Sequence, residues 1–282
     1  MINIERYAGT QANVNSYLLS DAENVIVVDL LRNSHEAVAL ADHVEATGKK
    51  LAGIFISHGH PDHYIGLGVF HRRFPEAPVS VASTEIRDDI IGFSQWMDSV
   101  GWLDAEPDMK VRSASNPDGF DYTGVIQVLN EPVLRLPLAH GDINVRSDYT
   151  GGECGHMTTL CIPEQNAFMA FDLLYNGVHA WCGPGVDKPE IRNWIQTLNQ
   201  ITRETGDEGW IFYCGHGPEG GHELVANMEH YLETFIVVTS AAESRQAAIM
   251  KMKELFPGFA QDDFLLLQSV NFHVQDRPAA LK

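Results

Sequence analysis

The sequence FISHGHPDHYIG, residues 55–66, places three histidines and one aspartate within six positions, at the end of an apolar run. Histidine is scarce in ordinary sequence, so this density of metal-binding side chains needs an explanation. Two interpretations are open at this point. The stretch is either a turn that happens to be polar, or one half of a metal site whose other half lies downstream. The run before it, LAGIFIS at 51–57, predicts a strand buried on both faces.

The spacing of the four side chains favours a site for two ions. His58 and His60 alternate with Gly59, which suits two ligands on one short extended segment, and Asp62 and His63 follow across the stiff Pro61. Imidazole and carboxylate groups suit zinc, whereas calcium would take oxygen ligands only. Four ligands on one loop are awkward for a single tetrahedral ion, because adjacent side chains point in different directions. Two ions side by side remove this difficulty.

Two ions need further ligands, and the sequence offers three downstream. His156 lies in a glycine-rich loop before a predicted strand, Asp172 follows the apolar strand AFMAF, and His216 follows the apolar strand GWIFYC. Polar residues that end buried strands lie where open sheets place their chemistry.

Composition and charge restrict the class of protein. The 282 residues carry 19 basic and 38 acidic side chains, a formal charge of −19, which opposes binding to nucleic acid. No apolar run reaches the roughly 20 residues that span a bilayer. The N-terminus lacks the pattern of a signal peptide, so we expect a cytoplasmic protein without a membrane partner. The four cysteines form no C-x-x-C pair and are expected to be reduced.

The pattern of elements predicts one domain over residues 1–282 that combines sheets and helices. Residues 83–102 predict a helix, and 103–123 predict an irregular loop, so 83–123 is an insertion expected to cover the site. The other predicted helices are 33–50, 188–205, 222–236 and 240–255. Strands are predicted at 13–20, 24–30, 51–57, 124–129, 143–147, 159–163, 167–171 and 209–214. Strands in blocks beside helices favour sheets covered by helices, and periodicity alone does not name the fold.

The chain resembles the metallo-β-lactamase-fold superfamily in its H-x-H-x-D-H motif at 58–63 and in the later His156, Asp172 and His216. The resemblance implies an α/β (α+β) fold, an αββα sandwich of two mixed β-sheets flanked by helices. It also implies the distribution of the ligands between two divalent ions. His58, His60 and His156 would hold the first, Asp62, His63 and His216 the second, and Asp172 would bridge both. Zinc is the expected metal, and iron or manganese replaces it in some relatives.

The resemblance further implies a hydrolase. A hydroxide that bridges the metals would attack an ester, lactone, thioester or related acyl bond, with Asp62 as general acid–base. Glyoxalase-II-like and acyl-homoserine-lactonase branches share all seven ligands, whereas β-lactamases of this fold generally carry Cys or Ser in place of Asp172. Amide hydrolysis of the β-lactamase type and iron-dependent persulfide oxidation remain the alternatives.

Several residues near the motif have two interpretations. Tyr175, three residues after Asp172, is either a catalytic hydroxyl of the kind found in lactonases or a packing residue. His179 either contacts substrate or orients a ligand, or it is a packing residue. Asp29, in the strand at 24–30, is a candidate support for the histidines. Tryptophans 96, 102 and 181 either line an apolar pocket or belong to the core. The substrate is expected to be a small molecule, and a homodimer is the default assembly.

Overall fold

The computed structural model describes residues 1–206 and 209–276. The chain divides into two compact units, one formed by Met1–Asp148 with Thr158–Phe168, the other by Tyr149–Met157 with Met169–Lys282. The prediction of a single domain stays a prediction. Within the described residues, no helix combines the length and the apolar character that a membrane span requires.

A six-stranded sheet forms the centre of the first unit, with strands in the order β1-β2-β3-β4-β5-β6. β1 to β3 pair antiparallel, and β3 to β6 pair parallel. The bounds of these strands are β1 Asn3–Ala8, β2 Asn15–Ser20, β3 Asn24–Val28, β4 Lys50–Ile56, β5 Val79–Val81 and β6 Ile126–Val128. Only the C-terminal half of β4 is buried, so the predicted burial along the whole strand is wrong for its first residues.

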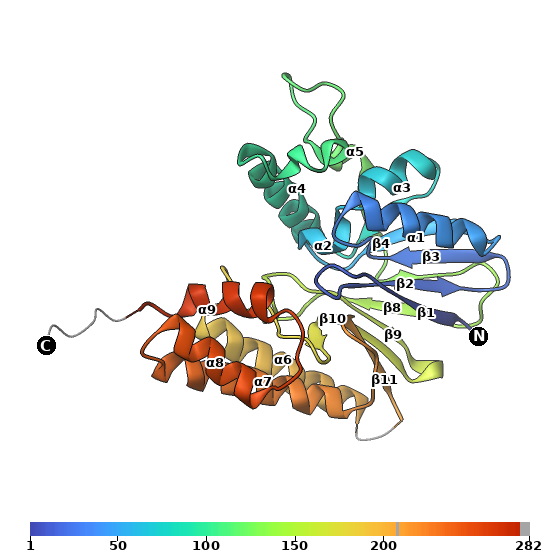
Figure 1. Cartoon of the computed structure of the whole chain (residues 1–282). Coiled ribbons are helices and arrows are strands. Elements are labelled where there is room, and N and C mark those ends of the chain that lie inside the picture. The colour runs from blue at the N-terminus through green and yellow to red at the C-terminus, as the bar shows by residue number, and fades with distance from the viewer. Residues whose placement is uncertain (207–208, 277–282) are drawn as a thin grey trace, which may run out of the picture. The chain divides into compact units, whose positions relative to one another are not determined.

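Helices accompany this sheet, and Figure 1 shows α1 and α3 together beside its strands. The helices of the first unit are α1 Ser34–Ala46, α2 Pro61–Tyr64, α3 Leu67–Arg73, α4 Thr84–Ser99, α5 Tyr122–Val125 and the short turns η1 Trp102–Asp104, η2 Pro107–Met109 and η3 Pro163–Gln165. Asn33 caps α1, because its side chain accepts a hydrogen bond from the Glu36 N–H at 2.8 Å. Leu40 and Val44 of α1 are buried in the core of this unit, as helical spacing predicts.

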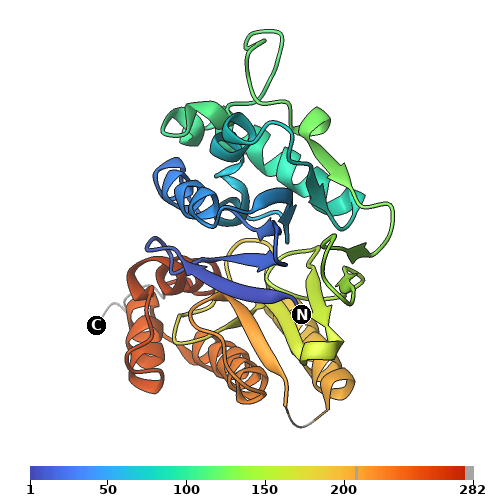
Figure 2. The ribbon, with the colours of Figure 1, turned by 90° about the vertical axis from the view of Figure 1, so that its right-hand side faces the viewer.

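The predicted helix at 83–102 is present as α4, and the segment after it is mostly irregular. Ile86, Ile90 and Met97 face the core, whereas Val100 lies beyond the helix and is exposed. A bridge between Val111 and Phe120 closes the base of the following loop. Its green tip extends away from the rest of the first unit in Figures 1 and 2.

The remaining strands belong to a second sheet. β7 Val133–Leu134, β8 Ile143–Arg146 and β9 Thr159–Ile162 pair antiparallel in the first unit. β10 Ala167–Tyr175 enters the second unit at Met169 and neighbours β11 Ile211–His216 there. The second unit also contains α6 Lys188–Thr205, α7 Glu223–Ala241, α8 Arg245–Leu255, the π-helical turn η4 Asp262–Leu266 and α9 Leu267–His273.

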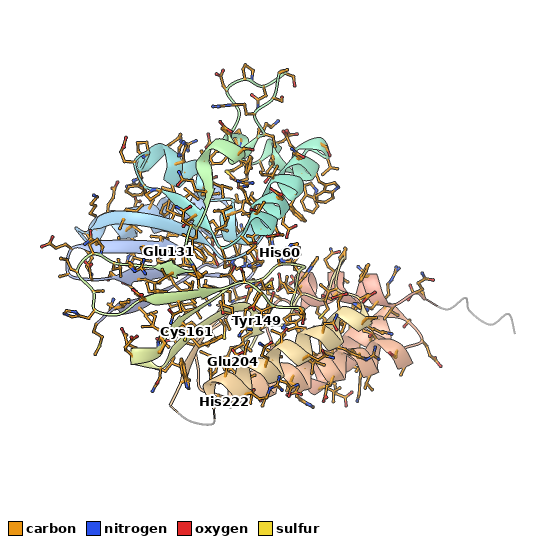
Figure 3. The ribbon with its side chains drawn as sticks, turned by 180° about the vertical axis from the view of Figure 1, so that it is seen from behind. His60, Glu131, Tyr149, Cys161, Glu204 and His222 are labelled. Atoms are coloured by element: carbon orange, nitrogen blue, oxygen red, sulfur yellow. The ribbon has the colours of Figure 1, made fainter. Side chains whose placement is uncertain are left out.

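Two of the long helices of the second unit, α6 and α8, begin at side-chain caps. The predicted helix at 188–205 is confirmed in full as α6, and Asp187 caps it by accepting from the Glu190 N–H. The predicted break between the last two long helices lies further along the chain, because α7 continues to Ala241 and Ser244 caps α8. Figure 3 labels Glu204 near the end of α6 and His222 before α7.

Candidate metal centre

The histidine loop, residues 57–63, leaves the sheet of the first unit beside the end of β3. β3 and β4 run parallel with Val28 opposite Phe55, so the residues that follow them emerge at the same edge of the sheet. Asp29 follows β3, and Ser57 follows β4. Both are fully buried. Figure 3 labels His60, which lies immediately before α2.

The Asp29 carboxylate holds this loop in place. Its Oδ1 accepts a hydrogen bond from the Ser57 N–H at 2.8 Å, and its Oδ2 accepts from the Ser57 hydroxyl at 2.7 Å. The same Oδ2 lies 2.8 Å from Nδ1 of His63. The interpretation of Asp29 as a support for the histidines is therefore confirmed.

These contacts assign the ring tautomers of two predicted ligands. The Asp29 carboxylate is an acceptor, so His63 carries its proton on Nδ1. The Ser57 hydroxyl gives its one proton to Asp29, so it accepts from Nδ1 of His58 at 2.9 Å. Both rings would therefore coordinate a metal through Nε2. A histidine whose Nδ1–H is held by a carboxylate is the usual arrangement around protein-bound metals.

The structure brings the four predicted ligands of this loop together in two pairs. Ligand atoms of His58 and His60 lie within 4.8 Å of each other, and so do those of Asp62 and His63. Three imidazoles and one carboxylate form a donor set that suits divalent transition metals. The residues present in this unit fit the predicted metals.

Helix α4 lies directly against the loop. A Cβ atom at Gly59 would stand 2.8 Å from Cβ of Asp89, so a glycine is required there. The ring of His60 lies 6.4 Å from the ring of Phe93, measured between centroids. The predicted insertion at 83–123 therefore contacts the histidine loop through α4, and its role as a cover for the site stays a prediction.

Two further predicted ligands lie side by side in the second unit, Asp172 in β10 and His216 at the end of β11. Nε2 of His216 lies 3.0 Å from Oδ2 of Asp172, and both residues are buried. Gly215 allows this approach, because a Cβ atom there would stand 1.6 Å from Oδ1 of Asp172. Gly217, at φ +85°, has similarly little room, since its Cβ would stand 2.0 Å from the Asn176 carbonyl oxygen.

Tyr175 is placed between two carboxylates of the second unit. Its hydroxyl donates to Oδ2 of Asp172 at 2.9 Å and forms a very short contact with Glu153. Its ring stacks on the His216 ring with centroids 4.6 Å apart and planes 3° apart. In this arrangement Tyr175 positions the carboxylate and imidazole of two predicted ligands. Its predicted catalytic role stays a prediction.

Glu153 is a residue that the sequence-based reasoning missed. It is 2% exposed, and one of its carboxylate oxygens lies within 4.8 Å of an Asp172 oxygen. His156, in the same loop, is half-buried and belongs to no cluster of three or more ligand atoms within the described part of the chain. The sequence does contain a signal for Glu153, a carboxylate three positions before a histidine in the glycine-rich stretch GGECGH. The predicted role of His156 as a ligand stays a prediction.

The loop that carries Glu153 is fixed to α6. A Cβ atom at Gly151 would stand 2.3 Å from the backbone of Asn193, and the Thr197 hydroxyl donates to the Gly151 carbonyl at 2.8 Å. The Trp194 indole N–H donates to the Leu173 carbonyl in β10 at 3.2 Å. Helix α6 thus holds both the loop and the strand that supplies Asp172.

Comparison with known proteins adds the fold family. Residues 9–124 match the family model described as the metallo-beta-lactamase superfamily, and this segment contains the whole histidine loop. A metallo-beta-lactamase from Pontibacter korlensis superposes with a TM-score of 0.58 at 11% identity, covering 83% of this chain and 99% of that one.

The chain has the metallo-β-lactamase fold. The predicted superfamily resemblance and fold class, an αββα sandwich, are confirmed. The B3 metallo-beta-lactamase BLEG-1 gives a TM-score of 0.57 at 16% identity, covering 82% of this chain and 99% of that one. The mono-zinc form of the metallo-beta-lactamase FIM-1 from Pseudomonas aeruginosa gives a TM-score of 0.56 at 14% identity, covering 82% of this chain and 95% of that one. No curated protein matches the sequence. At these identities the neighbours establish the metallo-β-lactamase fold and nothing about substrate.

His179 lies away from these contacts, in the interior of the second unit. It is 1% exposed, and its Nδ1 lies 3.1 Å from the Tyr231 hydroxyl. Burial lowers the pKa of His179 to about 4, although Asp262 favours the charged form. His179 is therefore neutral at physiological pH, and its predicted contact with substrate or with a ligand stays a prediction.

Proposed function

We propose that this chain is a metal-dependent hydrolase that cleaves an ester, lactone, thioester or related acyl bond. The observation that carries the proposal is the network of Asp29 and Ser57, which sets the tautomers of His58 and His63 within the segment that matches the superfamily. A buried carboxylate that holds a histidine by Nδ1 serves a metal better than it serves packing. A polar turn without a metal would not need this arrangement.

The proposed ligand set consists of the seven residues predicted from the sequence, His58, His60, Asp62, His63, His156, Asp172 and His216. Divalent ions held there, zinc by preference, supply Lewis acidity and lower the pKa of water into the physiological range. The protein orients the imidazoles through Asp29 and Ser57. Asp62 lies in the first turn of α2, and in this proposal its carboxylate would take a proton from the nucleophile and return it to the leaving group.

Esters, lactones and thioesters are favoured over β-lactams because a carboxylate, Asp172, stands where dedicated β-lactamases of this fold generally have Cys or Ser. The formal charge of −19 also favours uncharged substrates over phosphodiesters and other anions.

A panel of lactone, thioester, β-lactam, phosphodiester and sulfate-ester substrates tests the proposal, together with metal analysis of the purified protein. We expect hydrolysis of at least one acyl substrate, loss of turnover on chelation, and recovery when zinc is added. A measurement of oxygen uptake with a persulfide substrate distinguishes hydrolysis from the alternative activity, iron-dependent persulfide oxidation, because only the oxidation consumes oxygen.

The matched variants are His58→Ala and His140→Ala, since His140 is an exposed histidine of the same unit. Only His58→Ala should lower the metal content and the turnover. A folded, metal-loaded protein that hydrolyses no member of the panel, or a His58→Ala variant with unchanged metal content, would refute the proposed function.

A further inference from the structure

A row of aromatic rings runs outward from the histidine loop across α4 and η1. The centroid of the His60 ring lies 6.4 Å from that of Phe93, Phe93 lies 5.4 Å from Trp96, and Trp96 lies 4.9 Å from Trp102. We call Phe93, Trp96 and Trp102 the aromatic row. All of these residues belong to the first unit. The row thus forms a continuous aromatic path that begins at a predicted metal ligand.

The two tryptophans of the row are exposed to solvent. Trp96 is 46% exposed and Trp102 is 60% exposed, whereas Phe93 is half-buried. Of the two interpretations that the sequence left open for these tryptophans, membership of the core is wrong. Large aromatic side chains grouped on a surface usually mark a binding site.

Helix α4 packs on the core through one apolar stripe, and Trp96 lies beside that stripe. Ile86, Ile90 and Met97 are buried and form this stripe. Phe93 shares the face of these residues and packs against the core from a half-buried position, whereas Trp96 and the exposed Val100 lie at the margin of that face. Packing on the core therefore accounts for Phe93, but it does not account for the exposed Trp96 and Trp102.

The charges of α4 indicate what the row can bind. The helix carries four carboxylates, Glu85, Asp88, Asp89 and Asp98, and one arginine. That arginine, Arg87, pairs with Asp88 at 3.6 Å. An anionic group would be repelled here, whereas an uncharged apolar group would lose contact with water and gain contact with the rings.

We propose that the aromatic row binds the uncharged apolar part of the substrate, an aliphatic or aromatic acyl group, while the bond to be cleaved lies at the histidine loop. This inference rests on the proposed function and narrows its substrate class to apolar acyl compounds. The path from His60 to Trp102 gives such a group a direction in which to extend, and longer chains contact more of the row.

The kinetic test compares an acetyl thioester with a decanoyl thioester. In a variant with Trp96→Ala and Trp102→Ala, the KM for the decanoyl substrate should rise about tenfold or more, because burial of apolar area on two rings is lost. The kcat for both substrates and the KM for the acetyl substrate should stay unchanged. Replacement of both residues by Phe should restore most of the decanoyl affinity.

The matched control is Phe272→Ala, which removes an aromatic residue of α9 that is 44% exposed. It should leave both KM values unchanged. Equal KM values for the decanoyl substrate in the wild type and the double Trp variant would overturn the inference. Conversion of a dimer to a monomer in that variant, with KM unchanged, would also overturn it and would identify the row as a subunit interface.

A binding measurement keeps this inference separate from the proposed function. Saturation-transfer NMR with decanamide, a neutral and unreactive probe, should show binding to the wild type and to Phe272→Ala. The double Trp variant should show little binding. This pattern in a protein without hydrolytic activity would refute the acyl hydrolase and retain the aromatic row as a binding surface. Equal transfer in all three proteins would refute the row itself.

Discussion

Replacement of Asp29 tests the support of the histidine loop most directly. In Asp29→Ala, three buried donors lose their acceptor, namely the Ser57 N–H, the Ser57 hydroxyl and Nδ1–H of His63. Each unsatisfied buried donor costs about 1–3 kcal/mol, and these contributions are not additive within one network. Since breaking a buried charged contact costs about 3–5 kcal/mol, we expect the free energy of unfolding to fall by this amount.

The metal affinity should fall as well, because Asp29 fixes the tautomer and orientation of His63. Loss of a group that supports a ligand typically lowers metal affinity about 10- to 100-fold. Asp29→Asn keeps the shape of the side chain but lacks one acceptor oxygen, so its effects should be smaller than those of Asp29→Ala. Urea unfolding of the chelated protein measures the stability, and competition with a chromophoric chelator measures the affinity for zinc.

Asp21→Ala is the matched control, because Asp21 is another buried carboxylate of the same unit. It accepts from the N–H groups of Glu23 and Leu138, each at 2.8 Å, and both of these residues lie outside the histidine loop. This variant should lose stability without losing metal affinity. If Asp29→Ala lost stability and kept the affinity of the wild type, the reasoning about ligand orientation would be refuted.

Three further predictions concern the second unit. Gly215→Ala should prevent β11 from packing against Asp172 and should lower the free energy of unfolding by at least about 3 kcal/mol, as measured by thermal unfolding. The control is Gly92→Ala in α4 of the first unit, where a Cβ atom meets open space, and it should raise the free energy of unfolding by up to about 1 kcal/mol. Asp172→Ala should lower the metal content, and Tyr175→Phe should retain the metal, as measured by elemental analysis. The folded pKa of His179, about 4, lies below its ordinary value of 6.5, so its stability contribution is complete above pH 6.5 and falls toward pH 4. Between pH 6.5 and pH 4, the free energy of unfolding of the wild type should fall by up to about 3 kcal/mol more than that of His179→Gln. An equal dependence of this free energy on pH in both proteins would contradict the lowered pKa of His179.

The parts of the structure that the sequence predicts are those with local patterns. The apolar runs of β3, β4 and β11 and the extent of α6 depend on neighbours in the chain, so they are predicted within a few residues. The burial of only half of β4 depends instead on contacts from elsewhere in the fold, which no local pattern records.

In the candidate site, too, residues that are close in the sequence are predicted, whereas Glu153, which only folding brings to Asp172, is not. The histidine motif is visible as a motif because its four ligands lie within six consecutive positions. Glu153 is 19 positions before Asp172, and only folding of the second unit brings their carboxylates together. The sequence left Trp96 and Trp102 open between an apolar pocket and the core, because their exposure depends on how α4 and η1 pack on the rest of the first unit.

Backbone strain connects the fold to the proposed chemistry. Two site-related residues that are not glycine adopt left-handed conformations, Asp29 at φ +61° and Phe171 at φ +48°. Such a conformation costs an ordinary residue roughly 1–2 kcal/mol, and glycine would remove that cost at either position. Glycine at position 29 would also remove the carboxylate that holds Ser57 and His63, and Phe171 directly precedes Asp172 in β10. At these two positions the strained backbone therefore carries or directly precedes a carboxylate of the proposed site, which fits selection for that site more than selection for stability alone.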